Sequence, residues 1–207
     1  MEEADLLGAW RAGDTAAGQA FFERHYDALH RFFDNKTSGE TADLVQETLE
    51  ACVAGRDRIR ASTSVRGYLF GIAYNVLRRH YERTRLAGER FDPEAQSVAD
   101  AGAGPGTMAA KGEAQRRLLE GLRRIPLELQ VVLELFYWEE MTSAAIADAL
   151  GEPHGTIRTR VRRARQLLRI AIETTTEPGG DASATDADLD EWAAQIRAAQ
   201  DGPHPSQ

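Results

Sequence analysis

A run of arginines in the last third of the sequence has the strongest chemical character in the chain. Residues 154–169, HGTIRTRVRRARQLLR, contain six arginines and no acidic residue. A guanidinium group pairs in a bidentate way with phosphate oxygens or with the edge of a guanine. A local field of this kind attracts phosphates whatever the net charge of the whole chain. The segment therefore predicts a nucleic-acid-binding helix rather than an ordinary basic surface helix.

The residues around this run predict a helix-turn-helix. Thr142 is placed to cap a short helix, TSAAIADAL, and Gly151 is placed to end it. Glu152 and Pro153 then turn the chain into a second helix, which begins near His154. That helix has an apolar inward face and a polar outward face, so it is suited to enter a major groove. The outward residues are Thr159, Arg162, Arg163 and Gln166, flanked by Arg158, Arg160, Arg165 and Arg169.

A second pattern lies in the first half of the sequence. Residues 69–77 have apolar side chains at helical spacing, and residues 78–85, RRHYERTR, extend that helix with four arginines against one glutamate. Upstream, another predicted helix carries Asp43, Gln46, Glu47 and Glu50 along one face; from spacing alone this favours a solvated surface. Its opposite, apolar face is predicted to consist of Val45, Leu49, Cys52 and Val53.

The net charge of −8 argues against a nucleic-acid ligand only as an average. Residues 173–207 hold eight acidic residues and one basic residue, so almost the whole acidic excess lies there.

Hydrophobic residues make up 42% of the 207 residues, enough to bury a core. The first residues are acidic and no apolar run reaches the roughly 18 residues of a membrane span. We therefore expect a cytoplasmic protein without a membrane partner.

The sequence offers little support for catalysis. The five histidines are scattered, and the one cysteine, Cys52, excludes an internal disulfide and a multi-thiolate zinc site. Residues 102–107, GAGPGT, superficially resemble a phosphate loop, but no lysine follows in the required frame. We expect no enzyme activity, no metal site, no cofactor and no small-molecule substrate.

Composition divides the chain into four parts. Residues 88–112 are rich in Gly, Ala and Pro without an apolar periodicity, which is typical of a flexible linker. The predicted fold is all-α, with two small helical domains at 1–87 and 113–172 joined by that linker, the second domain containing the helix-turn-helix. Residues 173–207 form an acidic tail, in which a short amphipathic helix around Trp192 is expected.

Two segments together resemble a known family. The segment DLVQETLEACVAGRDRIRASTSVRGYLFGIAYNVLRRHYERTR is similar to region 2 of the extracytoplasmic-function (ECF) group of bacterial RNA polymerase sigma factors. The segment LRRIPLELQVVLELFYWEEMTSAAIADALGEPHGTIRTRVRRARQLL is similar to region 4 of the same group. The resemblance covers both predicted domains, in the order of the family and with a linker between them. A helix-turn-helix alone is a weak indication of this family. Together with the segments DLVQE and FGIAYN upstream, it is a strong indication.

The resemblance implies roles for residues already singled out. The residues that match the polymerase-binding helix of the family are Asp43, Gln46, Glu47 and Glu50. Partner contact therefore replaces the interpretation of this face as a solvated surface. Those that match the −10 element-binding surface are Arg60, Ser62, Thr63, Ser64, Tyr68, Asn75, Arg78 and Arg79, with residues 60–65 forming a loop that captures a flipped base. Those that match the −35 element-binding surface are Thr142, Thr156, Arg158, Thr159, Arg160, Arg162, Arg163 and Arg165, of which Arg160 and Arg165 would contact phosphates.

The implied function is that of a transcription initiation factor whose partners are core RNA polymerase and promoter DNA, with an anti-sigma factor or another regulator as a further partner.

Three residues or segments depart from the family pattern. Tyr68 stands where the family usually has Trp, the loop sequence ASTSV matches no known specificity loop, and Arg162 occupies a position that is often apolar. These departures leave the promoter sequence undefined.

Two alternatives remain open from the sequence. A stand-alone helix-turn-helix regulator would explain residues 113–172 but would leave DLVQE and FGIAYN without a role. The second alternative is an interaction protein whose acidic tail mimics nucleic acid. The tail itself has two interpretations: it folds back on the arginine helix and inhibits DNA binding, or it is a disordered solubilising segment.

Overall fold

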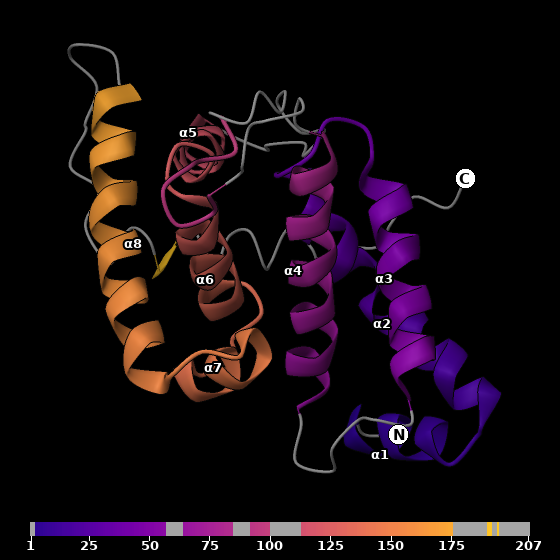
Figure 1. Ribbon diagram of the computed structural model, residues 1–207. Helices are drawn as coiled ribbons and strands as arrows, with labels where there is room; N and C mark the ends of the chain where they lie inside the picture. Colours follow the sequence, from indigo (N-terminus) through magenta and orange to yellow (C-terminus); the bar gives the residue numbers. More distant parts are fainter. Residues whose placement is uncertain are drawn as a thin grey trace.

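Helices form the regular structure of the computed structural model, which describes residues 3–56, 64–84, 92–99 and 113–175, together with 190, 191 and 194. The first four are α1 (Glu3–Arg11), α2 (Thr15–Asp34), α3 (Thr41–Gly55) and α4 (Val65–Thr84). The next four are α5 (Glu113–Leu122), α6 (Leu127–Tyr137), α7 (Ser143–Leu150) and α8 (His154–Thr175) (Figure 1). The predicted all-α class is confirmed.

Local sequence signals set several of the helix ends. The Asp14 carboxylate caps α2 by accepting hydrogen bonds from the backbone N–H groups of Ala16 and Ala17, at 2.9 and 3.1 Å. The hydroxyl of Thr142 caps α7 by accepting from the N–H of Ala145 at 3.1 Å. Gly151 ends α7 with φ of 70° and ψ of 31°, a left-handed conformation that costs glycine little. The predicted cap and stop of the short helix are therefore confirmed.

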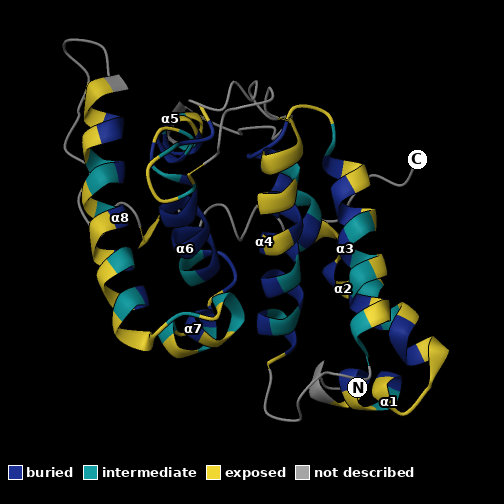
Figure 2. Cartoon of the chain, viewed as in Figure 1, coloured by how far each residue is buried: buried dark blue, intermediate teal, exposed yellow. Residues whose placement is uncertain are grey.

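Helices α1 to α4 form the first block, in which each helix packs against the next. Its centre is aromatic: Phe21, Phe33 and Phe70 are completely buried, and the ring centroids of Phe32 and Phe70 lie 5.6 Å apart. Figure 2 shows the buried sides of α3 and α4 as dark blue bands and their outer turns as yellow. This packing leaves one face each of α3 and α4 available to partners.

Helices α5 to α8 form the second block around α6. Helix α6 is apolar on most sides, and its residues 127–135 are all buried, including Glu128, Gln130 and Glu134. Helices α5 and α8 pack together through a cluster that includes Leu118, Leu122 and Leu168. Helix α7 packs against α6 and α8, which positions the outward face of α8 relative to the turn at Gly151.

The two blocks share a hydrophobic core. Phe33, Phe70 and Leu77 of the first block belong to the same buried cluster as Val131 and Ile146 of the second block. Helix α4 packs directly on α7, and Figure 1 shows α7 beside the lower end of α4. The blocks predicted from composition thus lie in contact with each other in this structure.

Part of the predicted linker packs against the second block. Val98 is completely buried, and Ser97 forms an isolated antiparallel bridge with Pro126. The backbone N–H of Leu127 donates to Gln96 O at 3.0 Å, and the N–H of Glu128 donates to Pro93 O at 3.0 Å. These bonds satisfy N–H groups at the start of α6, which have no partner within the helix. Residues 92–99 therefore belong to the packed structure, although composition predicted a flexible linker throughout 88–112.

Candidate nucleic-acid and protein-binding surfaces

The outward face of α8 presents four of the eight predicted −35 residues to solvent. Arg158, Thr159, Arg162 and Arg163 are exposed, while Ile157 on the opposite side is completely buried. The Thr159 hydroxyl donates to Gly155 O at 3.1 Å, so it is held along the helix. Beside this face lies an open depression of about 600 Å³, whose lining includes Arg158, Arg162, Arg165 and Arg169. A surface with this charge and shape is suited to anionic groups such as nucleic-acid phosphates.

Two arginines predicted to contact phosphates are engaged by the protein itself. Arg160 has a side chain only 15% exposed and forms ion pairs with Glu128 at 2.8 Å, Glu152 at 3.3 Å and Glu94 at 3.6 Å. The Arg165 guanidinium lies over the rings of Tyr137 and Phe136, at 5.2 and 5.7 Å from their centroids. Sequence reasoning missed the carboxylate partners because Glu94 and Glu128 are distant from Arg160 in the chain.

Two of the three threonines of the predicted −35 set lie at helix starts. Thr142 is exposed and uses its hydroxyl to cap α7. Thr156 is half-buried in the first turn of α8, where its N–H donates to Pro153 O at 2.9 Å. Both therefore lie where helix N-termini favour an anion such as a phosphate.

The first block brings together three of the predicted −10 residues. Asn75, Arg78 and Arg79 are exposed on α4 and line an open depression of about 470 Å³ against Ala51 of α3, and Glu82 is the one acidic residue in its lining. The Arg78 guanidinium lies 5.9 Å from the centroid of the Tyr74 ring. Tyr74 and Phe70 are buried, so both rings belong to the core.

The other predicted −10 residues fall on and beside the segment between α3 and α4. Arg60, Ser62 and Thr63 lie outside the described residues. The Ser64 hydroxyl accepts from the N–H of Gly67 at 3.0 Å, at the start of α4. The Tyr68 hydroxyl donates to Cys52 O at 2.7 Å. Tyr68 therefore ties the start of α4 to the end of α3, and its half-buried ring braces both ends of the segment.

The predicted polymerase-binding residues share the outer face of α3. Asp43, Gln46 and Glu50 are exposed, and the Gln46 side-chain amide donates to Glu50 at 2.9 Å. Glu47 is half-buried and pairs with Arg83 at 3.0 Å and with Arg79 at 3.4 Å. Glu47 therefore links the acidic face of α3 to the basic face of α4.

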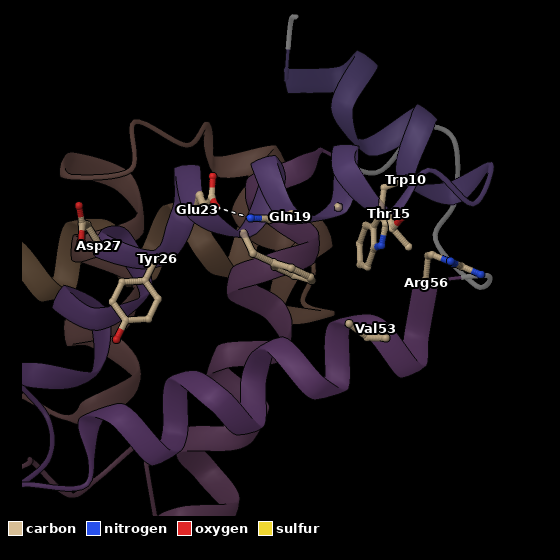
Figure 3. Close-up of a pocket in the computed structure, with 10 residues that line it drawn as sticks. Trp10, Thr15, Gln19, Glu23, Tyr26, Asp27, Val53 and Arg56 are labelled. Carbon is tan, nitrogen blue, oxygen red and sulfur yellow. Dashed lines mark hydrogen bonds between the residues drawn. The ribbon is translucent and has the colours of Figure 1, made fainter.

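One surface feature escaped the sequence analysis. Val53 was predicted to be part of the buried face of α3, but its side chain is 54% exposed. It lines an open apolar groove of about 700 Å³ together with Trp10, Phe22 and Tyr26 (Figure 3). The periodicity of α3 does not reveal this groove, because its other walls are supplied by α1 and α2.

Burial changes the ionisation of several groups. Burial raises the pKa of the Cys52 thiol to about 12 and raises the pKa of the Tyr74 hydroxyl. Burial also lowers the pKa of His80, and the nearby Glu40 carboxylate partly opposes this decrease. The Cys52 thiol is completely buried, which is typical of an unreactive core thiol.

The described residues contain no group of three or more His, Cys, Asp or Glu side chains placed to hold a metal ion. None of the described helices has both the length and the apolar character needed to cross a membrane. What the described residues do offer is a helix-turn-helix with an exposed arginine face, beside a second helical block with its own basic depression. The fold and these surfaces define a DNA-binding protein of the helix-turn-helix class.

Comparison with known proteins narrows this class. Residues 115–168 match the family described as Sigma-70, region 4. The chain is 29% identical over 168 residues to the ECF RNA polymerase sigma factor SigM of Mycobacterium tuberculosis, covering 80% of this chain and 82% of SigM. It is 26% identical over 156 residues to the ECF RNA polymerase sigma factor SigW of Bacillus subtilis, covering 71% of this chain and 82% of SigW.

A solved structure shares the fold. The structure of CnrH in complex with the cytosolic domain of CnrY superposes with a TM-score of 0.62 at 20% identity, covering 84% of this chain and 99% of the matched chain. These findings support the resemblance of the chain to the ECF group of the sigma-70 family.

Proposed function

We propose that the chain is a transcription initiation factor that binds core RNA polymerase and directs it to promoters with specific −35 and −10 elements. The observation that carries this proposal is the combination of three exposed surfaces on one chain: the arginine face of α8, the basic depression on α4 and the acidic face of α3. A stand-alone regulator would need only the first of these surfaces.

In the second block, the exposed side chains of α8 are suited to read the −35 element. Arg158, Thr159, Arg162 and Arg163 face solvent together, and arginine can pair with guanine edges. Arg160 and Arg165 would contact phosphates only after exchanging their present carboxylate and aromatic partners for DNA. Thr142 and Thr156 would add phosphate contacts at the helix starts.

In the first block, the segment 60–65 would capture a base flipped out of the −10 element. Asn75 would lie beneath the captured base, and Arg78 and Arg79 would hold the backbone phosphates of the opened strand. Tyr68 would act by bracing the ends of α3 and α4, since its hydroxyl is already bonded to Cys52 O. Ser62, Thr63 and Ser64 would contact the captured nucleotide.

The exposed face of α3 would bind the polymerase through Asp43, Gln46, Glu47 and Glu50. Nucleotide addition would stay with the polymerase, so the factor itself would carry no catalytic site and no cofactor. It would act in the cytoplasm, where promoters and polymerase are found. Because CnrH was solved with the cytosolic domain of CnrY, a regulatory protein is a further partner to be sought.

Run-off transcription tests the proposal directly. Core RNA polymerase from a related bacterium is incubated with the full chain and a fragmented genomic library, and transcripts are mapped to their start sites. We expect a defined set of promoters that share −35 and −10 elements and that core polymerase alone does not use. Tight binding to duplex DNA without any polymerase-dependent transcript would instead assign the chain to the stand-alone regulators.

A further inference from the structure

Residues 92–99, which composition predicted to be part of a flexible linker, cover the start of α6, and we call them the strap. The backbone N–H of Leu127 donates to Gln96 O at 3.0 Å. The N–H of Glu128 donates to Pro93 O, also at 3.0 Å. The first N–H groups of a helix have no partner within the helix, so the strap supplies partners that α6 needs.

The strap is held in shape by its own hydrogen bonds. The backbone N–H groups of Gln96 and Ala95 donate to Asp92 O, at 2.8 and 3.2 Å. The Asp92 carboxylate accepts from the N–H of Glu94 at 3.0 Å. Val98, near the other end of the strap, is completely buried. These bonds and the buried side chain fix the backbone of Glu94, whose carboxylate lies beside α8.

Three carboxylates from different parts of the chain meet at one arginine of α8. The Arg160 guanidinium lies 2.8 Å from a carboxylate oxygen of Glu128, in the first turn of α6. It lies 3.3 Å from Glu152, between α7 and α8, and 3.6 Å from Glu94 of the strap. One side chain therefore connects α8 to α6, to the turn of the helix-turn-helix and to the strap.

Arg160 lies on a different side of α8 from the arginines that face solvent. It comes three residues after Ile157 and four residues before Ala164, and both of these are completely buried. Residues three and four apart share one face of a helix, so Arg160 points toward the second block, and its side chain is only 15% exposed. Arg158 and Arg162 are exposed on the outer side. The place of Arg160 on the helix therefore favours contacts within the protein.

Moving Arg160 to a phosphate would leave a buried carboxylate without its arginine partner. The Glu128 side chain is only 8% exposed. Burial raises the pKa of Glu128, and Arg160 is the largest of the charges that oppose this rise. Withdrawing one partner of a buried ion pair is strongly destabilising, whereas an exposed arginine reaches a phosphate without that loss. Arg160 is therefore expected to stay with its carboxylates when α8 binds DNA.

We propose that Arg160 is a positioning residue for DNA reading rather than a phosphate contact, and that the strap belongs to the same DNA-reading unit. By connecting α6, the turn and the strap, Arg160 sets the rotation of α8 about its axis, and with it the place of Thr159 and Arg163 on the base edges. A binding constellation must be held within roughly 0.5 Å and 10–20° of its productive geometry. Part of the predicted linker thereby contributes to the choice of DNA sequence without touching DNA. The −35 element as ligand rests on the proposed function; the connection of the strap to α8 does not.

Hydrogen exchange in the free full-length chain tests the strap without DNA or polymerase. The N–H groups of Leu127 and Glu128 should be protected, because carbonyls of the strap accept from them. Val98→Ala removes part of the buried anchor and should speed their exchange about tenfold. Val53→Ala, at a valine that is 54% exposed, is the matched control and should leave both rates unchanged. Equal rates in the two variants would overturn the strap.

Substitution of Arg160 distinguishes a positioning residue from a phosphate contact. The probes are a duplex that the full chain selects from a random-sequence pool and a scrambled duplex of the same composition, with both affinities measured by fluorescence anisotropy. Arg160→Gln should lower the ratio of selected to scrambled affinity about tenfold, comparable to one mismatched base pair. Binding to the scrambled duplex should keep the parental salt dependence. Loss of a phosphate contact would instead lower the slope of log affinity against log salt by about 0.9.

Arg160→Lys provides the conservative comparison at the same position. Lysine supplies a point charge that suits a phosphate, but it lacks the planar fork that reaches several carboxylates at once. The affinity ratio of Arg160→Lys should therefore lie closer to that of Arg160→Gln than to that of the parent chain. A parental ratio in Arg160→Lys, together with a reduced salt slope in Arg160→Gln, would make Arg160 a phosphate contact and overturn the proposal.

Glu94→Gln tests the same point at a side chain that is 70% exposed, where the fold is not at risk. If Glu94 only competed with DNA for Arg160, its neutralisation would tighten binding to both duplexes. Positioning predicts instead that the affinity ratio falls about twofold, and that Glu94→Gln has no further effect in the Arg160→Gln chain. Asp148→Asn, which neutralises an exposed acid on α7, controls for the change in net charge. A gain on both duplexes beyond that of Asp148→Asn would contradict the inference.

Run-off transcription with core polymerase separates this inference from the proposed function. Loss of sequence preference in Arg160→Gln, without any polymerase-dependent transcript from the parent chain, would leave the positioning role standing and reject the proposed function. Polymerase-dependent transcription in which Arg160→Gln keeps the parental promoter preference would confirm the function and reject the positioning role.

Discussion

At the scale of single residues, the six arginines of residues 154–169 divide into groups with different surroundings. Arg158, Arg162 and Arg163 project into solvent from α8. Arg160 is held by three carboxylates, and Arg165 lies over two aromatic rings. An arginine without a strong intramolecular partner can contact DNA with little rearrangement, so we expect base recognition to come from the first group.

Arg163→Ala should weaken binding to the cognate −35 duplex by about 1–3 kcal/mol and leave binding to a scrambled duplex nearly unchanged. The reason is that a bidentate contact to a base edge is lost only where that base is present. Fluorescence anisotropy with both duplexes measures the two affinities. Arg124→Ala, which removes an exposed arginine outside α8 that pairs with Glu120, is the control. Equal weakening on both duplexes would make Arg163 a phosphate contact.

Cys52 should react slowly with thiol reagents in the native protein. Burial raises its pKa to about 12, so roughly a thousandfold fewer molecules carry the reactive thiolate at pH 8.5 than in the unfolded chain. A disulfide exchange reagent, applied to native and urea-unfolded protein between pH 7 and 9, measures the difference. Because the unfolded thiol ionises first, the stability contributed by this group should be present below about pH 9 and be lost as the pH rises toward 12. Rapid native labelling at pH 8 would show that the thiol is accessible.

At the scale of elements, α7 and α3 are each held in place by a small number of contacts. Helix α7 spans only Ser143–Leu150, too short to be stable alone, so its cap and its packing against α4, α6 and α8 hold it. Helix α3 exposes one face and buries the other, which includes Leu44, Val45 and Cys52, within the first block. Changes at the ends of α7 should therefore affect stability, whereas changes on the outer face of α3 should affect partner binding.

Thr142→Ala should lower the free energy of unfolding by about 0.5–2 kcal/mol, because the N–H of Ala145 loses its capping partner. Thr142→Ser keeps a hydroxyl at the same position and should retain most of the stability. Urea unfolding monitored by circular dichroism gives both values. A Thr142→Ala chain as stable as the Thr142→Ser chain would show that the cap contributes nothing measurable.

Gln46→Ala combined with Glu47→Ala should weaken association with core polymerase without unfolding the second block. The exposed amide and carboxylate are lost from α3, and Arg79 and Arg83 lose their partner on that helix. Glu173→Ala, an exposed acid at the end of α8, is the control. Pull-down with immobilised core polymerase measures the affinity, and binding of the −35 duplex confirms that α8 is intact. Unchanged polymerase affinity would remove α3 from the proposed interface.

At the scale of the whole molecule, charge is distributed unevenly along the chain. The net charge is −8, yet residues 1–172 sum to only −1, and their densest runs of arginine are residues 78–85 and 154–169. The acidic excess is thus a property of residues 173–207, and it does not oppose DNA binding by the helical blocks. The resemblance to sigma factors leaves this segment unexplained.

Truncation after Thr175 changes the net charge to −2 and should leave DNA affinity at 0.15 M salt within about twofold. The acids are spread over a long segment, and exposed charges are screened beyond about 8 Å at that ionic strength. Titrations of the full and truncated chains at several salt concentrations test this. A large gain on truncation that weakens as salt is added would show instead that the tail competes with DNA for α8.

The sequence by itself determined the helical class, the helix-turn-helix and the exposed arginines of α8. These features depend on short-range signals: the cap at Thr142, the left-handed Gly151 and the helical spacing of Ile157 and Val161. Each signal acts within a few residues, so local chemistry is enough to predict it. The roles implied for α3 and α4 come from the resemblance, and it too depends on contiguous motifs in the sequence.

Only the tertiary structure decided which of these residues are available. Lys36 meets Glu134 from 98 positions away in the chain, and Arg160 meets Glu94, which lies in the predicted linker. Val53 lies on a periodic apolar face but is exposed, because α1 and α2 form a groove over it instead of covering it. Such pairings depend on how whole blocks pack together, and helical periodicity carries no information about a partner on another helix. For that reason the contacts of residues 92–99 with α6 and α8 became visible only in three dimensions.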